Sequence, residues 1–457
     1  MNDFMISVSG VRGIVGRSIS PDIVARFAAA FGTFMERGHV VIGRDSRESG
    51  EWMKHAVVSG LLSTGCGVVD LGICPTPTVQ LMAEEYDGGV VITASHNPAE
   101  WNGLKFIRGN GLFLDTDQGA ELLHVYKHNT IHYANWDASG DIVHRRDALK
   151  GHIDRILRLE LLNVEAVRRR KFSVVIDCCN GAASTVGPQL LSALGCEVIA
   201  LHCQPTGVFP HNPEPVPAHL DDLCSAVKNK NADVGFALDP DGDRLSIVSN
   251  QGEALGEEYT LAIAAKYMVS KRKGPVVVNL STSKMIDDIA AEADVPVIRT
   301  AVGEIHVALR MREVDSIFGG EGNGGVILPE AHYGRDALVG IALILQALGE
   351  WRAALSEVVE TMPRYHIVKR KYELRGEEPA AVMEMLADVY AKQSPDVSDG
   401  VKVNWSDRWV HVRSSNTEPV LRVIAEAPTH KEAEELCDGT IRTIESLKES
   451  QTLRTTM

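Results

Sequence analysis

The sequence predicts an α/β protein of three or four domains that ends in a smaller α+β module. The chain has 457 residues, which is more than one core serves, because single hydrophobic cores stop growing at roughly 250 to 300 residues. Runs rich in Val and Ile at 40–43, 90–93, 173–177 and 276–279 alternate with amphipathic stretches of helix length. This alternation is typical of α/β units with parallel or mixed sheets.

The C-terminal part of the chain has a different pattern. Polar and apolar residues alternate over 401–405, 409–413 and 421–426, which predicts three strands, and a helical pattern follows over 429–447. We therefore expect a small α+β module at this end.

Composition limits the classes of partner. Hydrophobic residues make up 44% and charged residues 23% of the chain, which is typical of globular proteins and unlike disordered ones. The net charge of −15 argues against nucleic acid or an anionic membrane as the main partner, since both require a basic surface. A small anionic ligand still fits if basic residues cluster locally.

No targeting or membrane segment is expected. The first residues lack the basic leader and apolar core of a signal peptide, and the longest apolar stretch, 338–348, is too short to span a bilayer. We therefore expect a cytoplasmic protein. The eight cysteines form no Cys-x-x-Cys pair, so they indicate neither a zinc site nor a disulfide framework.

The first candidate site residue is Ser95. The strand that ends near Thr93 continues as AlaSerHisAsnPro, which puts Ser95 at the carboxyl end of a buried strand, where open α/β sheets bind ligands. Pro98 prevents the strand from continuing through Asn97, and polar neighbours such as His96 can donate to phosphate oxygens. The alternative is a simple polar turn.

An acidic loop provides the candidate metal ligands. A strand over 234–238 runs into AspProAspGlyAspArg, which contains Asp239, Asp241 and Asp243. Three carboxylates at this spacing can converge on one hard cation such as Mg²⁺, with room left for a phosphate oxygen. Arg244 beside them could stabilise a phosphoryl group. An exposed acidic turn is the alternative, but it leaves three like charges unrelieved.

Two further loops carry candidate binding residues. In the glycine-rich segment 316–328, Glu321 and Asn323 lie between two predicted strands and suit hydrogen bonds to sugar hydroxyls; a flexible hairpin turn is the alternative. The Gly-x-Gly-x-x-Gly match there lacks the following helix of a dinucleotide site. A second loop after a strand could bind a phosphate through Arg side chains and hydroxyls. The alternative is an ordinary solvated loop. Its candidate residues are Arg413, Ser415, Asn416, Thr417 and, shortly after, Arg422.

These four loops, in this order, resemble those of the α-D-phosphohexomutase superfamily, and the resemblance covers essentially the whole chain. ThrAlaSerHisAsnPro and AspProAspGlyAspArg are its most specific motifs, and ProHisAsnProGluPro and AsnGlyLeuLysPhe also match. The resemblance implies three similar mixed-sheet α/β domains and a smaller C-terminal α+β domain around a central cleft. We expect these domains over 1–148, 149–254, 255–365 and 366–457.

The resemblance also implies roles for the loop residues. Ser95 would be a phosphoserine and would complete a Mg²⁺ site with the three aspartates of the acidic loop. Arg12, Lys105 and Arg244 would be the basic residues near the point of transfer, with Lys105 or Arg12 as a proton shuttle. Glu321 would contact sugar hydroxyls, and the loop that begins at Arg413 would bind the non-reacting phosphate.

Two departures from the family pattern bear on the substrate. Many relatives have a sugar loop that reads Gly-Glu-x-Ser-Gly-His, whereas this chain has Asn323 and Gly325 at the Ser and His positions. The proton-transfer group is therefore open, with His332 as a speculative substitute. Glu304 stands where phosphomannomutase-like members have His, and in this respect the chain is more similar to phosphoglucosamine mutases. A carboxylate at this position would also suit the amine of glucosamine.

The resulting hypothesis is a mutase that interconverts hexose 6-phosphate and hexose 1-phosphate through a bisphosphorylated sugar, with glucosamine phosphate as the favoured substrate. Glucose or mannose phosphate is the first alternative, and a metal-dependent sugar phosphatase is the second. A sensor without activity is disfavoured because no key residue is lost. The expected partners are the sugar phosphate and Mg²⁺, and the chain is expected to be a monomer or a homodimer.

Overall fold

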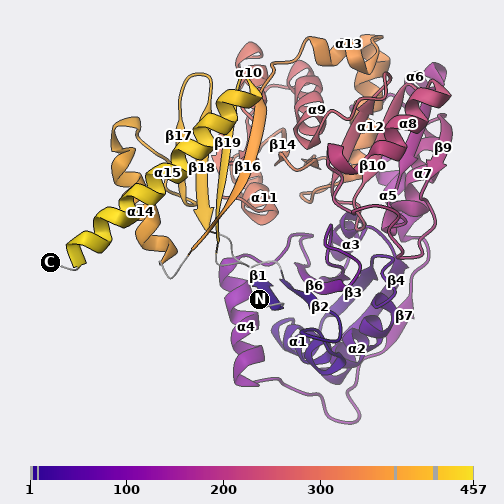
Figure 1. Cartoon of the computed structure of the whole chain (residues 1–457). Helices are drawn as coiled ribbons and strands as arrows, with labels where there is room; N and C mark the ends of the chain where they lie inside the picture. The colour runs from indigo at the N-terminus through magenta and orange to yellow at the C-terminus, as the bar shows by residue number, and fades with distance from the viewer. Residues whose placement is uncertain (1–3, 8–9, 375–377, 415–419, 456–457) are drawn as a thin grey trace.

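The computed structural model describes residues 4–7, 10–374, 378–414 and 420–455, with side chains described up to residue 447. Four domains, numbered I to IV in chain order, succeed one another around the middle of the molecule, so that domain IV returns beside domain I (Figure 1). The α/β class and the smaller C-terminal domain predicted from the sequence are confirmed. The residue boundaries between domains stay a prediction.

Domain I is a mixed sheet of seven strands in the order β1-β2-β6-β5-β3-β4-β7. Its Val-rich and Ile-rich central strands are buried, with one hydrophobic cluster on each face of the sheet. Its elements are β1 (Phe4–Ser7), β2 (Gly10–Ile14), α1 (Pro21–Phe34), β3 (His39–Arg44), α2 (Gly50–Ser63), β4 (Gly67–Ile73), α3 (Thr76–Ala83), β5 (Gly88–Ile92), β6 (Trp101–Arg108), α4 (Thr116–His128) and β7 (Ile142–His144).

Domain II contains a four-stranded sheet in the order β11-β10-β8-β9, parallel except for the β10–β11 hairpin. The hairpin turn is the acidic loop. The elements are α5 (Ala148–Leu157), α6 (Val164–Arg170), β8 (Ser173–Asp177), η1 (Ala182–Ser184), α7 (Val186–Ala193), β9 (Glu197–Leu201), η2 (Pro217–His219), α8 (Asp221–Lys230), β10 (Val234–Leu238) and β11 (Leu245–Ser249).

Domain III repeats this plan, with the strand order β13-β12-β14-β15 and a β14–β15 hairpin whose turn is the glycine-rich loop. Its elements are α9 (Glu257–Lys271), β12 (Val276–Asn279), α10 (Met285–Glu292), β13 (Val297–Thr300), α11 (Glu304–Glu313), β14 (Phe318–Glu321), β15 (Gly325–Ile327), α12 (Ala337–Trp351) and α13 (Leu355–Glu360). One continuous hydrophobic cluster joins domains II and III. The two hairpins are therefore held by a common core.

Domain IV is an antiparallel sheet in the order β16-β19-β18-β17, with its own hydrophobic cluster. Helix α15 lies across this sheet in yellow (Figure 1). The elements are β16 (His366–Glu373), α14 (Pro379–Val389), η3 (Ala391–Gln393), β17 (Val401–Asn404), β18 (Trp409–Ser414), β19 (Val420–Ala427) and α15 (His430–Thr455). Within the described parts of the chain, every helix is too short or too polar to cross a bilayer.

Candidate active site

The loop that carries Ser95 follows strand β5 and is held in place by hydrogen bonds. Ser95 is only 3% exposed and has a left-handed backbone with φ 51°, a conformation that costs a non-glycine residue free energy and is concentrated at functional sites. Its amide donates to Thr93 Oγ1 at 2.8 Å. The buried Arg47 donates to the carbonyl oxygens of Ser95, Asn97 and Pro98 at 2.6 to 2.7 Å. The loop geometry is therefore fixed by the fold.

The hydroxyl of Ser95 reaches the acidic loop of domain II. Its Oγ donates to Asp239 Oδ2 at 3.0 Å, although the two residues are 144 positions apart in sequence. Gly242, with φ 68°, makes the turn that brings Asp239, Asp241 and Asp243 together, and all three side chains are fully buried.

This carboxylate cluster fits a divalent cation. One oxygen from each aspartate lies within 4.8 Å of the others, and Asp241 Oδ1 and Asp243 Oδ1 are buried without a hydrogen-bond partner among the described residues. Burial, with the charges of Asp241 and Asp243, raises the pKa of Asp239 well above its usual range. Buried carboxylates with unused oxygens are the donor set that Mg²⁺ prefers.

Two buried cations partly offset the aspartates. Lys105 Nζ, from β6, lies 2.7 Å from Asp241 Oδ2 and 3.2 Å from Asp243 Oδ2. Burial favours the neutral amine, but these two carboxylates outweigh it and raise the pKa of Lys105. Arg335 supplies the second cation, at 2.7 Å from Asp243 Oδ2. We call Ser95, Lys105, Asp239, Asp241, Asp243 and Arg335 the carboxylate centre.

Arg335 is a site residue that the sequence did not reveal. Besides Asp243, its guanidinium contacts Glu304 Oε2 at 2.9 Å and Glu321 Oε2 at 2.9 Å. Arg335 precedes the N-cap residue of α12, Asp336, whose Oδ1 accepts from the amides of Leu338 and Val339. A planar guanidinium can hold several carboxylates in fixed directions. Arg335 therefore connects the acidic loop with the glycine-rich loop.

The two predicted glutamates have different positions. Glu321 Oε1 accepts from Asn279 Nδ2 at 2.7 Å and from the Gly303 amide at 3.0 Å, and Glu321 lines a cavity. Both oxygens of Glu304 are occupied, by Gln80 Nε2 at 2.8 Å and by Arg335. Glu304 does not belong to the described lining of the cavity. The structure thus gives Glu304 contacts that orient Arg335.

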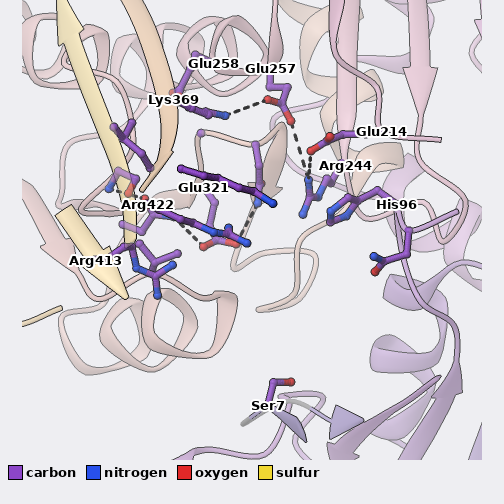
Figure 2. A pocket seen from close by; sticks show the side chains of 18 of the residues that line it. Ser7, His96, Glu214, Arg244, Glu257, Glu258, Glu321, Lys369, Arg413 and Arg422 are labelled. Carbon is purple, nitrogen blue, oxygen red and sulfur yellow. Dashed lines mark hydrogen bonds and ion pairs between the residues drawn. The ribbon is translucent and has the colours of Figure 1, made fainter. Parts of the chain in front are cut away.

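The cavity has a volume of about 720 Å³ and is lined by residues of all four domains. Figure 2 shows Arg413, Arg422 and Lys369 entering from domain IV, opposite Arg244 and His96, with Glu321 between them. The charged lining is mostly basic: Arg12, Arg244, Lys369, Arg370, Lys371, Arg413 and Arg422 face Glu214, Glu257, Glu258 and Glu321. In a chain of net charge −15, this local excess of cations favours an anionic ligand.

Ion pairs with separations of 3.6 to 4.0 Å connect basic side chains of the cavity with its glutamates. Arg244 lies 3.8 Å from Glu214 and 4.0 Å from Glu257, which in turn lies 3.6 Å from Lys369 of domain IV (Figure 2). The charge of Arg244, together with burial, holds the pKa of His96 well below its usual range. His96 therefore contacts the cavity as a neutral ring that can donate a hydrogen bond.

Most of the predicted site residues converge on this region. His96, Arg244, Glu321, Asn323, Arg413 and Arg422 line the cavity, as does Arg12, which donates to Asn97 Oδ1 at 3.0 Å. Ser95 and the three aspartates adjoin it in the carboxylate centre. Ser415, Asn416 and Thr417 lie outside the described residues.

Several lining residues were missed, and His332 lies elsewhere. Asn279 ends a predicted strand and Ser281 follows it, a position that could have marked both. The basic run 369–371 in β16 gave the clearest missed signal. His332 is buried, and its Nε2 is hydrogen-bonded to Asp336 at 3.0 Å. It therefore does not substitute for the histidine that many relatives have at the position of Gly325.

Comparisons with known proteins agree with this geometry. Four models of the phosphoglucomutase/phosphomannomutase family match in order: α/β/α domain I over 5–131, domain II over 150–252, domain III over 256–365 and the C-terminal domain over 368–442. The chain belongs to this family, within the α-D-phosphohexomutase superfamily. It is therefore a phosphohexomutase, an isomerase.

Named relatives cover nearly the full chain. A phosphoglucomutase/phosphomannomutase from Thermococcus kodakarensis is 38% identical over 95% of this chain and 97% of its own. A probable phosphoglucosamine mutase from Methanopyrus kandleri is 37% identical over 96% and 98%. A solved family protein from Burkholderia thailandensis is 26% identical, covers 97% of both chains and has a TM-score of 0.84. The two curated names differ in substrate, so membership in the family leaves the sugar open.

Proposed function

We propose that this phosphohexomutase uses Ser95 as the carrier of the phosphoryl group. One observation supports this above all: Ser95 Oγ donates to Asp239 of the acidic loop, beside a cavity with a basic lining. Phosphoryl transfer depends chiefly on the position of the nucleophile and on neutralisation of phosphate charge. The fixed Ser95 loop serves the first requirement, and the basic lining serves the second.

The proposed metal ligands are Asp239, Asp241, Asp243 and the phosphorylated Ser95. Bound Mg²⁺ would supply Lewis-acid polarisation of the transferring group. Arg244 and Lys105 would donate to the phosphoryl oxygens. Lys105 is held by Asp241 and Asp243, so its position is set before the substrate arrives, which limits reorganisation during transfer.

In the proposed reaction, the P–O bond to Ser95 Oγ breaks as a P–O bond to a sugar hydroxyl forms. The hydroxyl proton passes to a base; of the two expected shuttles, Arg12, whose pKa burial lowers, is the proposed group, because the raised pKa of Lys105 keeps its amine protonated. The bisphosphorylated sugar then reverses its orientation in the cavity, and its other phosphate returns to Ser95. The net result is an isomer of the substrate, with no phosphate released.

The proposed substrate contacts come from domains I, III and IV. Glu321 and Asn323 would bind sugar hydroxyls, and His96 would donate to a phosphate oxygen. Arg413 and Arg422, with Ser415, Asn416 and Thr417, would bind the phosphate that is not reacting. Because either end of the sugar must occupy this position in turn, its ligands need to recognise phosphate rather than a particular carbon.

We propose glucosamine phosphate as the preferred substrate. Glu304 does not carry this preference, because protein groups occupy both of its oxygens. One support is the name of the Methanopyrus relative. The other is the pair Glu214 and Glu257, which line the cavity 3.8 and 4.0 Å from Arg244, so that their carboxylates can accept hydrogen bonds from the amine of the sugar. Glucose or mannose phosphate is the second candidate, because the Thermococcus relative is named for those substrates.

A comparison of kcat/KM tests the substrate. Glucosamine, glucose and mannose 6-phosphates would each be assayed with a trace of the matching 1,6-bisphosphate. The expected result is a value at least about tenfold higher for glucosamine, a difference of about 1.4 kcal/mol; equal values would exclude it. Inorganic phosphate that accumulates as fast as substrate disappears would instead identify a phosphatase.

A further inference from the structure

A second polar cluster lies in domain II, at the carboxyl ends of β8 and β9. Asp177 Oδ2 is 2.8 Å from His202 Nδ1 and 3.1 Å from His211 Nε2. Asp177 is buried, and the side chains of His202 and His211 are 23% and 17% exposed. None of these residues has a role in the mechanism proposed above, and none belongs to the carboxylate centre.

The hydrogen count at His211 leaves one contact unexplained. Its Nδ1 lies 2.8 Å from the carbonyl oxygen of Asn212, and its Nε2 faces the Asp177 carboxylate. A neutral imidazole has one N–H and one lone pair, so it cannot donate to both oxygens. Either the ring carries a second proton or a cation lies between Nε2 and Asp177.

The other aspartate–histidine cluster shows what a complete network looks like. His152 and His332 both contact Asp336 Oδ2 through Nε2, at 2.7 and 3.0 Å. The opposite ring nitrogens face the Thr78 hydroxyl at 2.8 Å and the Gly334 amide at 3.1 Å, and both of these groups can donate. Each ring is satisfied as neutral imidazole, so this cluster requires no cation.

We propose that Asp177, His202 and His211 bind one divalent transition cation of the Zn²⁺ class. Two imidazoles and one carboxylate favour such a cation over Mg²⁺. Tetrahedral Zn²⁺ with bonds of about 2.0 to 2.1 Å requires ligand atoms roughly 3.3 Å apart. The separations here are 2.8 and 3.1 Å, so the partly exposed rings would move outward by a few tenths of an ångström to admit the ion. Three protein ligands leave the fourth position to water.

The surrounding contacts complete this assignment. With a cation on Nε2, the Nδ1–H of His211 donates to the Asn212 carbonyl, which is how metal-binding histidines are usually oriented. His202 Nε2 points toward Asp222, 3.9 Å away. Asp177 Oδ1 accepts from the Cys179 amide at 2.8 Å, so only its other oxygen is directed at the histidines.

A cation here would stabilise the loop over 202–216 next to the Ser95 loop. Phe209 lies against Arg47, with 4.9 Å between the guanidinium carbon and the ring centre, and Arg47 holds the Ser95 loop. Gly207 has φ 73° and passes so close to Ser46 that a Cβ would lie 2.2 Å from its carbonyl oxygen. The cation would therefore act on the site through the backbone that it fixes.

Zn²⁺ titration of metal-free protein in excess Mg²⁺ tests the proposal. We expect one equivalent to bind, and affinity to fall at least about 30-fold in His202→Gln and His211→Gln. The matched control is His144→Gln, which removes a histidine that pairs with Asp70 at 3.2 Å but belongs to no cluster of three candidate ligands among the described residues. Zn²⁺ should also slow amide hydrogen exchange over 202–216 in the wild type and in the control.

Two results would overturn the site. One is a Zn²⁺ affinity that is the same in both histidine variants as in the wild type. The other, which needs no variant, is nuclear magnetic resonance of the wild-type imidazoles: a proton that stays on His211 Nε2 in saturating Zn²⁺ would show a charged ring instead of a ligand. Loss of the Nε2 proton signal on titration supports the proposal.

Discussion

The carboxylate centre and the basic side chains of domain IV both adjoin the cavity, but they are held in opposite ways. Members of the carboxylate centre are at most 8% exposed, and each contacts another member. The domain IV wall, which we define as Lys369, Arg370, Lys371, Arg413 and Arg422, consists of exposed or half-buried side chains on strand faces. Buried ion networks fix positions, whereas exposed pairs contribute little to stability.

The difference matches the two tasks of a mutase. Transfer requires one geometry, which a buried network provides. In the proposed mechanism the sugar phosphate binds in two orientations, and long cationic side chains can accommodate both. Domain IV also has a hydrophobic cluster of its own, apart from the cluster that domains II and III share. If this comparison is right, substitutions in the centre should abolish activity, and those in the wall should weaken binding.

The largest effect is expected for Ser95→Ala. Removal of the proposed phosphoryl carrier should lower kcat by about 10⁴-fold or more, as for other covalent nucleophiles, and intact-mass spectrometry should find no phosphate on the variant. Ser46→Ala is the matched control, since Ser46 is equally buried in domain I and its hydroxyl has no described hydrogen-bond partner. An active Ser95→Ala enzyme would refute the proposed carrier.

Arg335→Lys should have the next largest effect. Lysine cannot contact Asp243, Glu304 and Glu321 at once in the geometry of a guanidinium, so buried carboxylates would lose their partner. We expect the free energy of unfolding to fall by about 3 kcal/mol and kcat to fall about 100-fold, measured by denaturant titration and at saturating substrate.

The control for Arg335 is Arg272→Lys. Arg272 also contacts two glutamates, Glu160 at 2.8 Å and Glu330 at 2.9 Å, but its side chain is 30% exposed. Its substitution should cost less than about 1 kcal/mol and leave kcat unchanged. Equal costs at the two positions would contradict the distinction between buried and exposed networks.

Much of the centre could be predicted from sequence because its motifs are local. Ser95 and the three aspartates each follow an apolar strand, β5 and β10 of two different sheets, and open α/β sheets bind ligands at the carboxyl ends of such strands. Arg335 lacks such a signal, since its partners lie 14, 31 and 92 positions away. The position of Glu304 also depends on contacts with Gln80 and Arg335 that no local pattern records.

The architecture was predictable to a similar degree. Alternating strands and helices determined the α/β class and the different C-terminal module. The common core of domains II and III was not foreseen, because it forms between helices such as α6 of domain II and α12 of domain III, whose apolar residues would equally suit separate cores. The basic run of β16 was overlooked because exposed charges on a strand are common on solvated faces.

A third prediction concerns the boundary between domains III and IV. Lys402 Nζ is buried there, donates to the Leu280 carbonyl at 2.6 Å and lies 4.6 Å from the centre of the Trp409 ring. Burial, followed by the charge of Arg299, lowers the pKa of Lys402 to about 7. Between about pH 7 and pH 10.4, the usual lysine pKa, the unfolded chain holds a proton that the folded protein lacks. The free energy of unfolding should therefore rise with pH across this window.

Lys402→Met isolates this contribution. We expect the difference in unfolding free energy between variant and wild type to favour the variant at pH 7 and to shrink by about 4 kcal/mol toward pH 10.4. The exposed Lys431 on α15, changed to Met, should give a difference that does not depend on pH. A flat difference for Lys402→Met as well would mean that the buried amine keeps its ordinary pKa.

The smallest effect is expected for Arg413→Ala in the domain IV wall. Arg413 pairs with Asp399 at 3.2 Å and lines the cavity, so its loss should remove one charged hydrogen bond to the distal phosphate. We expect kcat/KM to fall about 10- to 30-fold, or about 1.4 to 2 kcal/mol, almost entirely through KM, with a weaker dependence on salt. Arg442→Ala on α15 should change neither constant. If kcat fell instead with KM unchanged, Arg413 would act on the transition state, and the assignment of transfer to the centre and binding to the wall would be wrong.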